Sequence, residues 1–128
     1  MFVNQSNKVN DTATNSVIFH LDRADLERVD KMVTRFNEGQ GDNLMIIEPG
    51  MDSGPAIHDV ISNGKEINWI VDNSRDAWST DKGKTEYVCK LIRIHERDSD
   101  FIDVELSKCK NYKDDDQLRV LSFRKEKL

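Results

Sequence analysis

Three polar residues in the second half of the chain carry side chains suited to acid–base chemistry. His95 lies in a β-type run at 85–96, and Asp103 and Ser107 lie in a second run at 101–109. In an antiparallel hairpin with a three-residue loop at 98–100, His95 faces Asp103, and Ser107 shares their face. A small hydrolase would also need a pocket and an oxyanion donor. The chain has no nucleophile elbow or glycine-rich loop, so we favour a solvated cross-strand charge pair and assign no catalytic residue.

The same register brings the two cysteines opposite each other. Cys89 then faces Cys109 with Cβ atoms about 5 Å apart, close enough to bridge after a small adjustment. The register also separates apolar pairs from charged ones, placing Arg93 against Glu105, whereas a slip of one residue would mix the two faces. From spacing alone, a disulfide and two free thiols both remain open. A redox-catalytic pair is disfavoured because the Cys-x-x-Cys spacing is absent.

Metal and cofactor signals are absent from the sequence pattern. The three histidines, at positions 20, 58 and 95, lack zinc-type spacing. Asp72, Asp76 and Asp81 are a loose calcium set, but they lack the order of a calcium-binding loop. We therefore expect no metal and no cofactor.

His58 is expected to be an ordinary sheet residue rather than a catalyst. Its neighbour Asp59 points to the opposite face of a strand, so the two side chains cannot act together. In the register expected for this strand, His58 faces Trp69.

A contact surface is the best-supported kind of site. Trp78 lies in the polar connection 73–83, close to Arg75 and Asp76. Exposed aromatic residues beside charges are typical of contact sites. The alternative is that Trp78 folds back as a lid over an open end of the core.

A capped amphipathic helix is predicted at about 23–38. Asp22 is a good N-cap, and Gly39 and Gly41 supply the stop. The apolar residues that recur at helical spacing are Leu26, Val29, Val33 and Phe36.

After this helix the apolar period changes to two. Strands are expected at 44–47, 56–62, 65–72, 85–96, 101–109 and 118–123, and 17–19 is a short apolar patch that forms either a brief strand or a tuck into the core. Asn63-Gly64 predicts a two-residue turn that pairs Val60 with Ile67 and His58 with Trp69. The predicted fold class is α+β, one amphipathic helix followed by an antiparallel β-sheet of about five to six strands.

Length and charge limit the function classes. The 128 residues suit one domain, predicted at 17–124 after a flexible tail at 1–16. A net charge of −5 disfavours nucleic acid and anionic membrane surfaces. No apolar run is long enough for a membrane span, and the first residues lack the pattern of a signal peptide.

Five short runs resemble a domain-of-unknown-function family of small exported Bacillus-type lipoproteins, over about residues 20–110. They are Leu21-Asp22-Arg23-Ala24-Asp25-Leu26, Ala56-Ile57-His58-Asp59-Val60, Asn63-Gly64-Lys65-Glu66-Ile67, Val71-Asp72-Asn73-Ser74-Arg75-Asp76, and Val88-Cys89-Lys90 with Cys109. The resemblance implies a Cys89–Cys109 disulfide in oxidising surroundings. It supplies no catalytic residues.

The function expected from these observations is a non-catalytic binding module, exported or associated with the cell envelope. Its partner would be an unknown protein or cell-envelope ligand, and its oligomeric state is not predicted. A lipid anchor would have to precede this chain, and a cytoplasmic location is the alternative. Two other functions stay open: a small hydrolase using His95 and Asp103, and a cytoplasmic inhibitor or immunity-type binding protein.

Overall fold

The computed structural model describes residues 16–49, 54–73 and 83–128. Its elements are β1 (Val17–Ile18), α2 (Arg23–Asn37), β2 (Asp42–Glu48), β3 (Ala56–Ser62), β4 (Ile67–Asp72), β5 (Lys84–Glu96), β6 (Phe101–Cys109), β7 (Leu118–Arg124) and the short 3-10 helix η2 (Lys125–Lys127). The predicted tail, apart from Ser16, lies outside the described residues. So do Arg75, Asp76 and Trp78.

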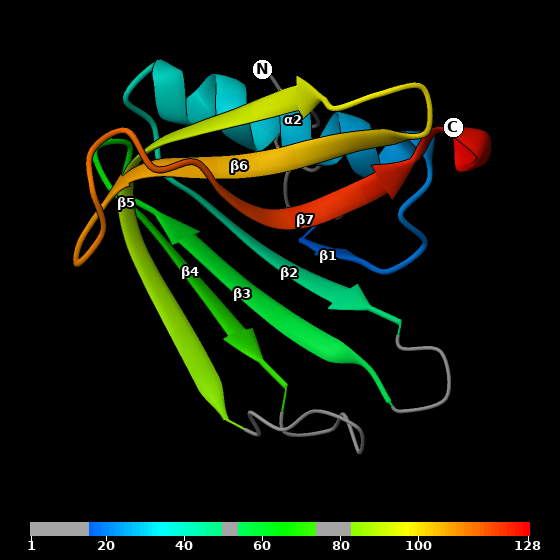
Figure 1. The fold of residues 1–128 in the computed structure, drawn as a ribbon, viewed down its shortest axis with the longest axis horizontal. Helices are drawn as coiled ribbons and strands as arrows, with labels where there is room; N and C mark the ends of the chain where they lie inside the picture. The colour runs from blue at the N-terminus through cyan, green and yellow to red at the C-terminus, as the bar shows by residue number, and fades with distance from the viewer. Residues whose placement is uncertain (1–15, 50–53, 74–82) are drawn as a thin grey trace, which may run out of the picture.

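All seven strands form one sheet in the order β1-β2-β3-β4-β5-β6-β7, which curls into a half-barrel (Figure 1). The predicted fold class, a helix followed by a sheet of five to six antiparallel strands, is therefore wrong. The sheet begins before the helix, because Val17 and Ile18 pair in parallel with Met45 and Ile46. This pairing reaches across α2, and the apolar pattern of a two-residue strand does not encode it.

The ends of α2 are set by local interactions of the residues that flank it. The Asp22 carboxylate accepts a hydrogen bond of 3.0 Å from the backbone N–H of Asp25, which satisfies one of the free donors of the first turn. Asp25 in turn accepts from the N–H groups of His20 and Leu21. The helix stops before Gly39, whose φ of 77° lies in the left-handed region. The predicted helix is thus confirmed to within a residue at its end.

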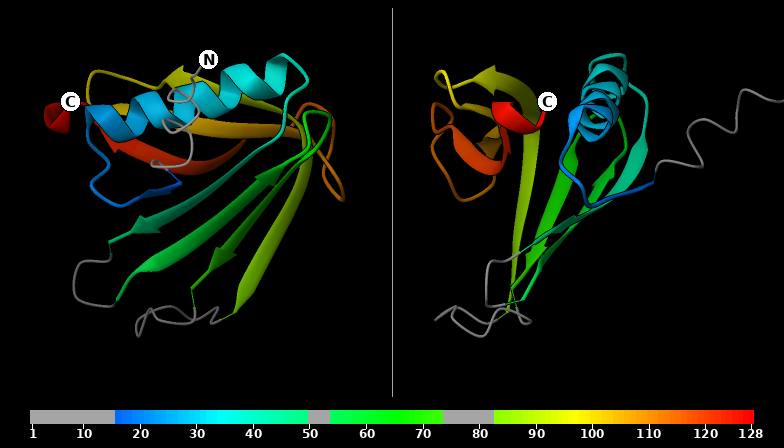
Figure 2. Two further views of the ribbon diagram at one scale, coloured as in Figure 1. Left: turned by 180° about the vertical axis from the view of Figure 1, so that it is seen from behind. Right: turned by 90° about the vertical axis from the view of Figure 1, so that its right-hand side faces the viewer.

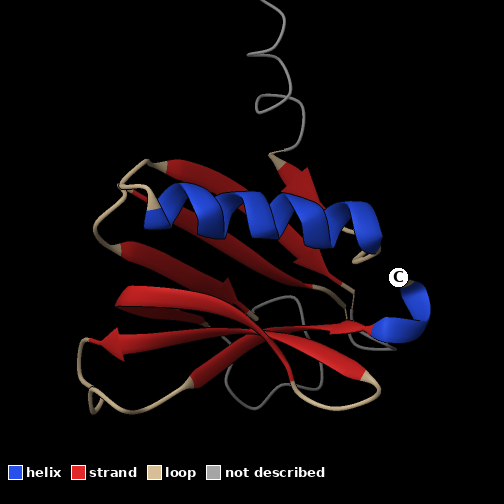
Figure 3. Ribbon diagram, turned by 90° about the horizontal axis from the view of Figure 1, so that it is seen from above, coloured by secondary structure: helices blue, strands red, loops and turns tan. Residues whose placement is uncertain are grey.

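The core lies between the buried face of α2 and the inner face of the curl. Seen from above, α2 lies across one side of the curled sheet (Figure 3), and the side view shows β6 and β7 facing the helix from the other side (Figure 2). The helix contributes Val29, Met32, Val33 and Phe36, which are buried. The largest buried sheet side chains are Trp69, Phe123, Ile46, Ile67 and Leu106.

One buried ion pair fixes the helix to β2. The guanidinium of Arg28 donates to both carboxylate oxygens of Asp42, at 2.8 and 2.9 Å, and to the carbonyl oxygen of Asn43 at 3.2 Å. A buried charge is tolerated only when it is paired and hydrogen-bonded in this way. The pair therefore fixes how α2 lies on the sheet.

The long strand β5 bends sharply near its middle, so that its lower half pairs with β4 and its upper half with β6 (Figure 1). At the bend, Lys90 and Leu91 are both exposed although Cys89 and Ile92 on either side are buried. The alternation of buried and exposed residues thus shifts by one. Lys108, in the facing part of β6, has a φ of 53°, a left-handed conformation that a non-glycine residue adopts only at a local distortion.

The bend places α2 and the β6–β7 pair together at one end of the molecule, while the lower ends of β3, β4 and β5 extend away from them (Figure 2). An angle therefore opens between the lower half of the sheet and the outer face of β6 and β7.

Of the two predicted hairpin registers, one is confirmed and the other is wrong. The register of β5 and β6 is confirmed, with His95 facing Asp103 and Cys89 facing Cys109. The register of β3 and β4 was wrong by two residues, because Ser62 faces Ile67 and Val60 faces Trp69.

The physical reason lies in Asn63. Its side-chain oxygen accepts hydrogen bonds from the N–H groups of Lys65 and Glu66, and its own N–H bonds to the carbonyl of Glu66. These bonds lengthen the connection to residues 63–66. A shift of two residues leaves every side chain on its predicted face.

Candidate functional site

A groove of about 540 Å³ lies along the outer face of β6 and β7 and reaches the lower half of β5. Its tyrosine end has Tyr87 and Tyr112, and its charged end has His95, Arg97, Asp103 and Arg119. The groove therefore contains two of the three residues that the sequence suggested for acid–base chemistry.

Asp103 is the anchor of the charged end. It is 1% exposed, and its carboxylate accepts hydrogen bonds from Arg97 Nε at 2.9 Å, from Arg97 Nη2 at 3.1 Å and from the Ser122 hydroxyl at 2.7 Å. Burial by itself would raise the pKa of Asp103, but the hydrogen bonds from Arg97 and Ser122, together with the charges of Arg97 and Arg119, hold it below its usual value. Asp103 is therefore an ionised structural group at neutral pH.

The side chain of Arg97 is held in place by Asp103 and by the ring of Phe101. Its guanidinium carbon lies 4.4 Å from the centre of the Phe101 ring, in addition to the two bonds to Asp103. The hydrogen bonds that Arg97 donates to Asp103 raise the pKa of Arg97 above its usual value. The Arg97–Asp103 pair thus forms a rigid floor.

The predicted acid–base group does not assemble. His95 faces Asp103 across the strands, but both oxygens of the carboxylate already accept from Arg97 and Ser122. Ser107 faces Leu91, four residues along β6 from Asp103, which corresponds to about 13 Å. Ser107 is also not part of the groove wall. No general base is therefore in reach of a nucleophile within this group.

Several polar side chains of the groove remain unengaged. Within the described part of the chain, Arg119 makes only a long ion pair of 3.9 Å with Asp103, and its side chain is 53% exposed. Neither His95 nor Gln117 has a side-chain hydrogen bond to another described residue. These donors and acceptors are available to a ligand.

The tyrosine end is built from two segments. The rings of Tyr87, on β5, and Tyr112, in the connection after β6, lie with centroids 6.1 Å apart. Burial, and to a lesser extent the neighbouring Tyr112, raise the pKa of Tyr87. Tyr87 is therefore a neutral phenol at neutral pH, able to donate a hydrogen bond and to present an aromatic face.

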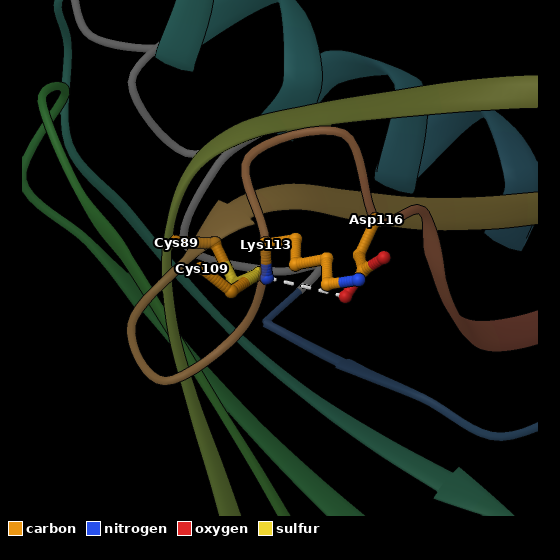
Figure 4. Close-up of a disulfide and its surroundings, with 4 residues drawn as sticks. All are labelled: Cys89, Cys109, Lys113 and Asp116. Carbon is orange, nitrogen blue, oxygen red and sulfur yellow. Dashed lines mark hydrogen bonds between the residues drawn. A yellow bond between two sulfur atoms is a disulfide. The ribbon is translucent and has the colours of Figure 1, made fainter.

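The disulfide holds this end in place. Cys89 and Cys109 are bonded, with Cα atoms 3.9 Å apart, at the bend of β5. The Tyr112 N–H then donates to the carbonyl of Cys109, and the Lys113 N–H donates to the Asp116 carboxylate at 3.2 Å, which closes the turn beside the disulfide (Figure 4). The disulfide and this turn together fix where Tyr112 stands.

Residues 14–103 match the family model described as "Domain of unknown function (DUF4362)", and the match covers more than half of the chain. The chain belongs to the DUF4362 family. No curated protein and no solved structure matches it. The DUF4362 match includes the bend of β5 and ends at Asp103, so Tyr112 and Arg119 follow the matched segment.

The described residues of this DUF4362 chain lack two other kinds of site. No described helix is long and apolar enough to cross a membrane. Residues 16–49, 54–73 and 83–128 hold no group of three or more histidines, cysteines and acidic residues placed to bind a metal ion. The loose calcium set of the sequence, apart from Asp72, lies outside these residues.

The sequence missed most of the groove. Tyr112 lies in the connection after β6, and Arg119 and Ser122 lie on β7, whose register with β6 was not predicted. The sequence does not mark Asp103 as buried either, because its apolar neighbours Ile102 and Val104 point to the opposite face of the strand.

Proposed function

We propose that this DUF4362 chain is a non-catalytic binding module that works outside the cytoplasm, secreted or anchored at the cell envelope, and that its contact site is the groove. One observation carries the proposal. The polar groups of Arg119 and Gln117, which are exposed, and of His95, which is half-buried, border a floor in which Asp103 is hydrogen-bonded to Arg97 and Ser122. The Arg97–Asp103 floor keeps the shape of the groove fixed, and the free polar groups can form hydrogen bonds and ion pairs with a ligand.

Binding is favoured over hydrolysis because of the way Asp103 is used. A carboxylate that orients a histidine must accept from that ring, whereas Asp103 accepts from Arg97 and Ser122. The groove then offers recognition groups without an activated nucleophile.

Export is supported by one observation. Disulfides persist in oxidising compartments, and Cys89 and Cys109 are paired. The cytoplasmic inhibitor is the less favoured function because it has no need of a disulfide.

A second contact surface is proposed in the connection 73–83. Arg75, Asp76 and Trp78 have the composition of a contact site. The described ends of β4 and β5, at Asp72 and Lys84, lie at the lower end of the sheet, away from α2 (Figure 1), and Arg75, Asp76 and Trp78 lie outside the described residues.

Retention of a component from the cell envelope of the source organism tests the proposal. The immobilised full chain is expected to retain a component that the double variant Tyr112→Ala/Arg119→Gln does not. Arg124→Gln is the matched control, since Arg124 is an exposed arginine on the same strand that borders a different cavity. Retention of nothing, or equal retention by the double variant, would contradict the groove as contact site; a loss in Trp78→Ala would assign the role to the second surface.

A further inference from the structure

We infer, on the basis of the proposed binding function, that the groove binds an acidic glycan segment, with a sugar ring on the two tyrosines and its carboxylate or phosphate group at Arg119.

The tyrosine end has the chemistry of a sugar-ring platform. Tyr112 is 43% exposed and Tyr87 is half-buried beside it, with the two ring planes at 39° to each other. A pyranose ring has one face of C–H groups, which packs on an aromatic ring, and a rim of hydroxyls, which need donors and acceptors. The phenol groups supply these beside the aromatic faces.

The charged end selects for a single anionic group. Three of the four charged side chains that line the groove already have a close partner, because Arg97 and Asp103 bind each other and Glu105 is bound to Arg93 at 2.8 Å. Arg119 is left as the cation without a close partner among the described residues. A guanidinium has a planar set of donors that matches a carboxylate or a phosphate.

Charge excludes a polyanion as the ligand. The whole chain carries a net charge of −5, which repels a ligand with many closely spaced phosphates. Nucleic acid binding would need several cations along the groove, and Arg119 alone does not provide them. A chain of mostly uncharged sugars with one acidic unit in the groove fits this balance.

The shape of the site excludes two other classes. A peptide added as an extra strand would pair with the backbone of an edge strand such as β7, whereas the groove lies over the faces of β6 and β7 and on Tyr87 of the interior strand β5. A lipid tail would need an enclosed apolar cavity, whereas charged and polar residues make up most of this wall.

The test is a titration of the full chain, followed by backbone amide shifts in NMR and by calorimetry. Three probes are used: a neutral oligosaccharide, an oligosaccharide of equal length with a single uronic acid unit, and a sugar phosphate. We expect the acidic probes to shift amides around Tyr112 and Arg119 and to bind more tightly than the neutral one. Comparison of the uronic acid oligosaccharide with the sugar phosphate tells which anion is the better fit.

Two pairs of variants decide whether the groove is responsible. Arg119→Gln is expected to weaken the acidic probe by about tenfold to hundredfold, to the level of the neutral one, because it removes a charged donor. Arg124→Gln is expected to leave the affinity unchanged. Tyr112→Ala should weaken all probes, and Tyr112→Phe should weaken them less, since it keeps the ring.

Equal affinity for neutral and acidic probes, or equal losses in Arg119→Gln and Arg124→Gln, would overturn the inference. If no probe binds but the envelope component is still retained through the groove, the ligand class is wrong and the proposed binding function stands. If neither the probes nor an envelope component bind, both proposals fail.

Discussion

The indole Nε1–H of Trp69 donates a hydrogen bond of 2.8 Å to Nδ1 of His58 inside the sheet. The other ring nitrogen of His58, Nε2, lies 2.9 Å from the carboxylate of Glu48. Since an indole N–H can only donate, Nδ1 must be the acceptor, and Nε2 carries the proton toward Glu48. His58 is therefore held neutral in one tautomer as the link in a buried chain of hydrogen bonds.

Replacement of His58 by alanine is expected to destabilise the protein by about 2–4 kcal/mol. The change leaves the buried Trp69 donor without a partner and opens a cavity. Urea unfolding followed by circular dichroism measures the loss. Glu48→Gln is the control, because the Glu48 side chain is 40% exposed and an amide oxygen still accepts from Nε2. Equal stability of the two variants would show that the Trp69–His58 bond contributes nothing.

Asp103 should make stability depend on pH in the acid range. Its pKa is lower in the folded state than the value of about 3.9 expected for the unfolded chain, so its contribution is present above that value and is lost as the pH falls toward the folded pKa. Asp103→Asn is expected to cost about 1–3 kcal/mol at pH 7 and to flatten the loss of stability below about pH 4.

The control for this change is Asp100→Asn, an exposed carboxyl in the same hairpin. Glu96 and Asp98, whose pKa values are also lowered, provide the acid dependence that remains. Urea midpoints measured from pH 2 to pH 7 give both curves. Identical curves for Asp103→Asn and the wild type would mean that Asp103 does not carry this dependence.

Removal of the disulfide is expected to cost about 3 kcal/mol. Cys89 and Cys109 are 20 residues apart, and closing a loop of that length restricts the unfolded chain by roughly this amount. Thermal and urea unfolding of the Cys89→Ala/Cys109→Ala variant measure the change. Mass spectrometry after alkylation, with and without reductant, should detect no labelling before reduction and two labels after it; labelling of the untreated protein would contradict the pairing.

Alanine substitutions at Gly39 and Gly64 distinguish the cost of a left-handed backbone from the cost of a steric clash. Gly64 has a φ of 87°, and a Cβ there would lie 2.3 Å from the backbone of Gly39. Gly39 has a φ of 77° but open space around it. Gly39→Ala is expected to cost about 1 kcal/mol for the left-handed conformation alone, and Gly64→Ala distinctly more, as measured by urea unfolding. Equal losses of unfolding free energy in the two variants would mean that the backbone around Gly64 and Gly39 moves apart at no cost to accommodate the added Cβ.

The parts of the fold that local chemistry decides could be predicted from the sequence. The register of β5 and β6 follows from a three-residue loop together with alternating side chains, because a slip of one residue would mix Ile92 and Ile94 with Arg93 and His95. The start of α2 follows from the cap at Asp22. The turn at Asn63-Gly64 was correctly located, but its length depends on hydrogen bonds of one side chain, which the dipeptide does not specify.

The parts that depend on distant segments could not be predicted. A shift in register between Val104 and Glu105 sets Arg119 opposite Glu105 and Ser122 opposite Asp103. This irregularity leaves no mark in the apolar pattern of 118–123. It nevertheless decides which side chains meet in the groove, so the site could not have been assembled from residue types and spacing.

The order of the strands also affects how the chain folds. Each strand pairs with the next strand along the chain, and the antiparallel pairs from β2 to β7 join neighbouring segments, so each of these pairings incurs little loss of chain entropy; the parallel β1–β2 pair, in contrast, spans α2. Folding can therefore proceed by adding one hairpin to the next. Only β1 must wait, because its partner β2 becomes available after α2 has formed and docked. The first strand of the sheet is thus expected to be the last to join it.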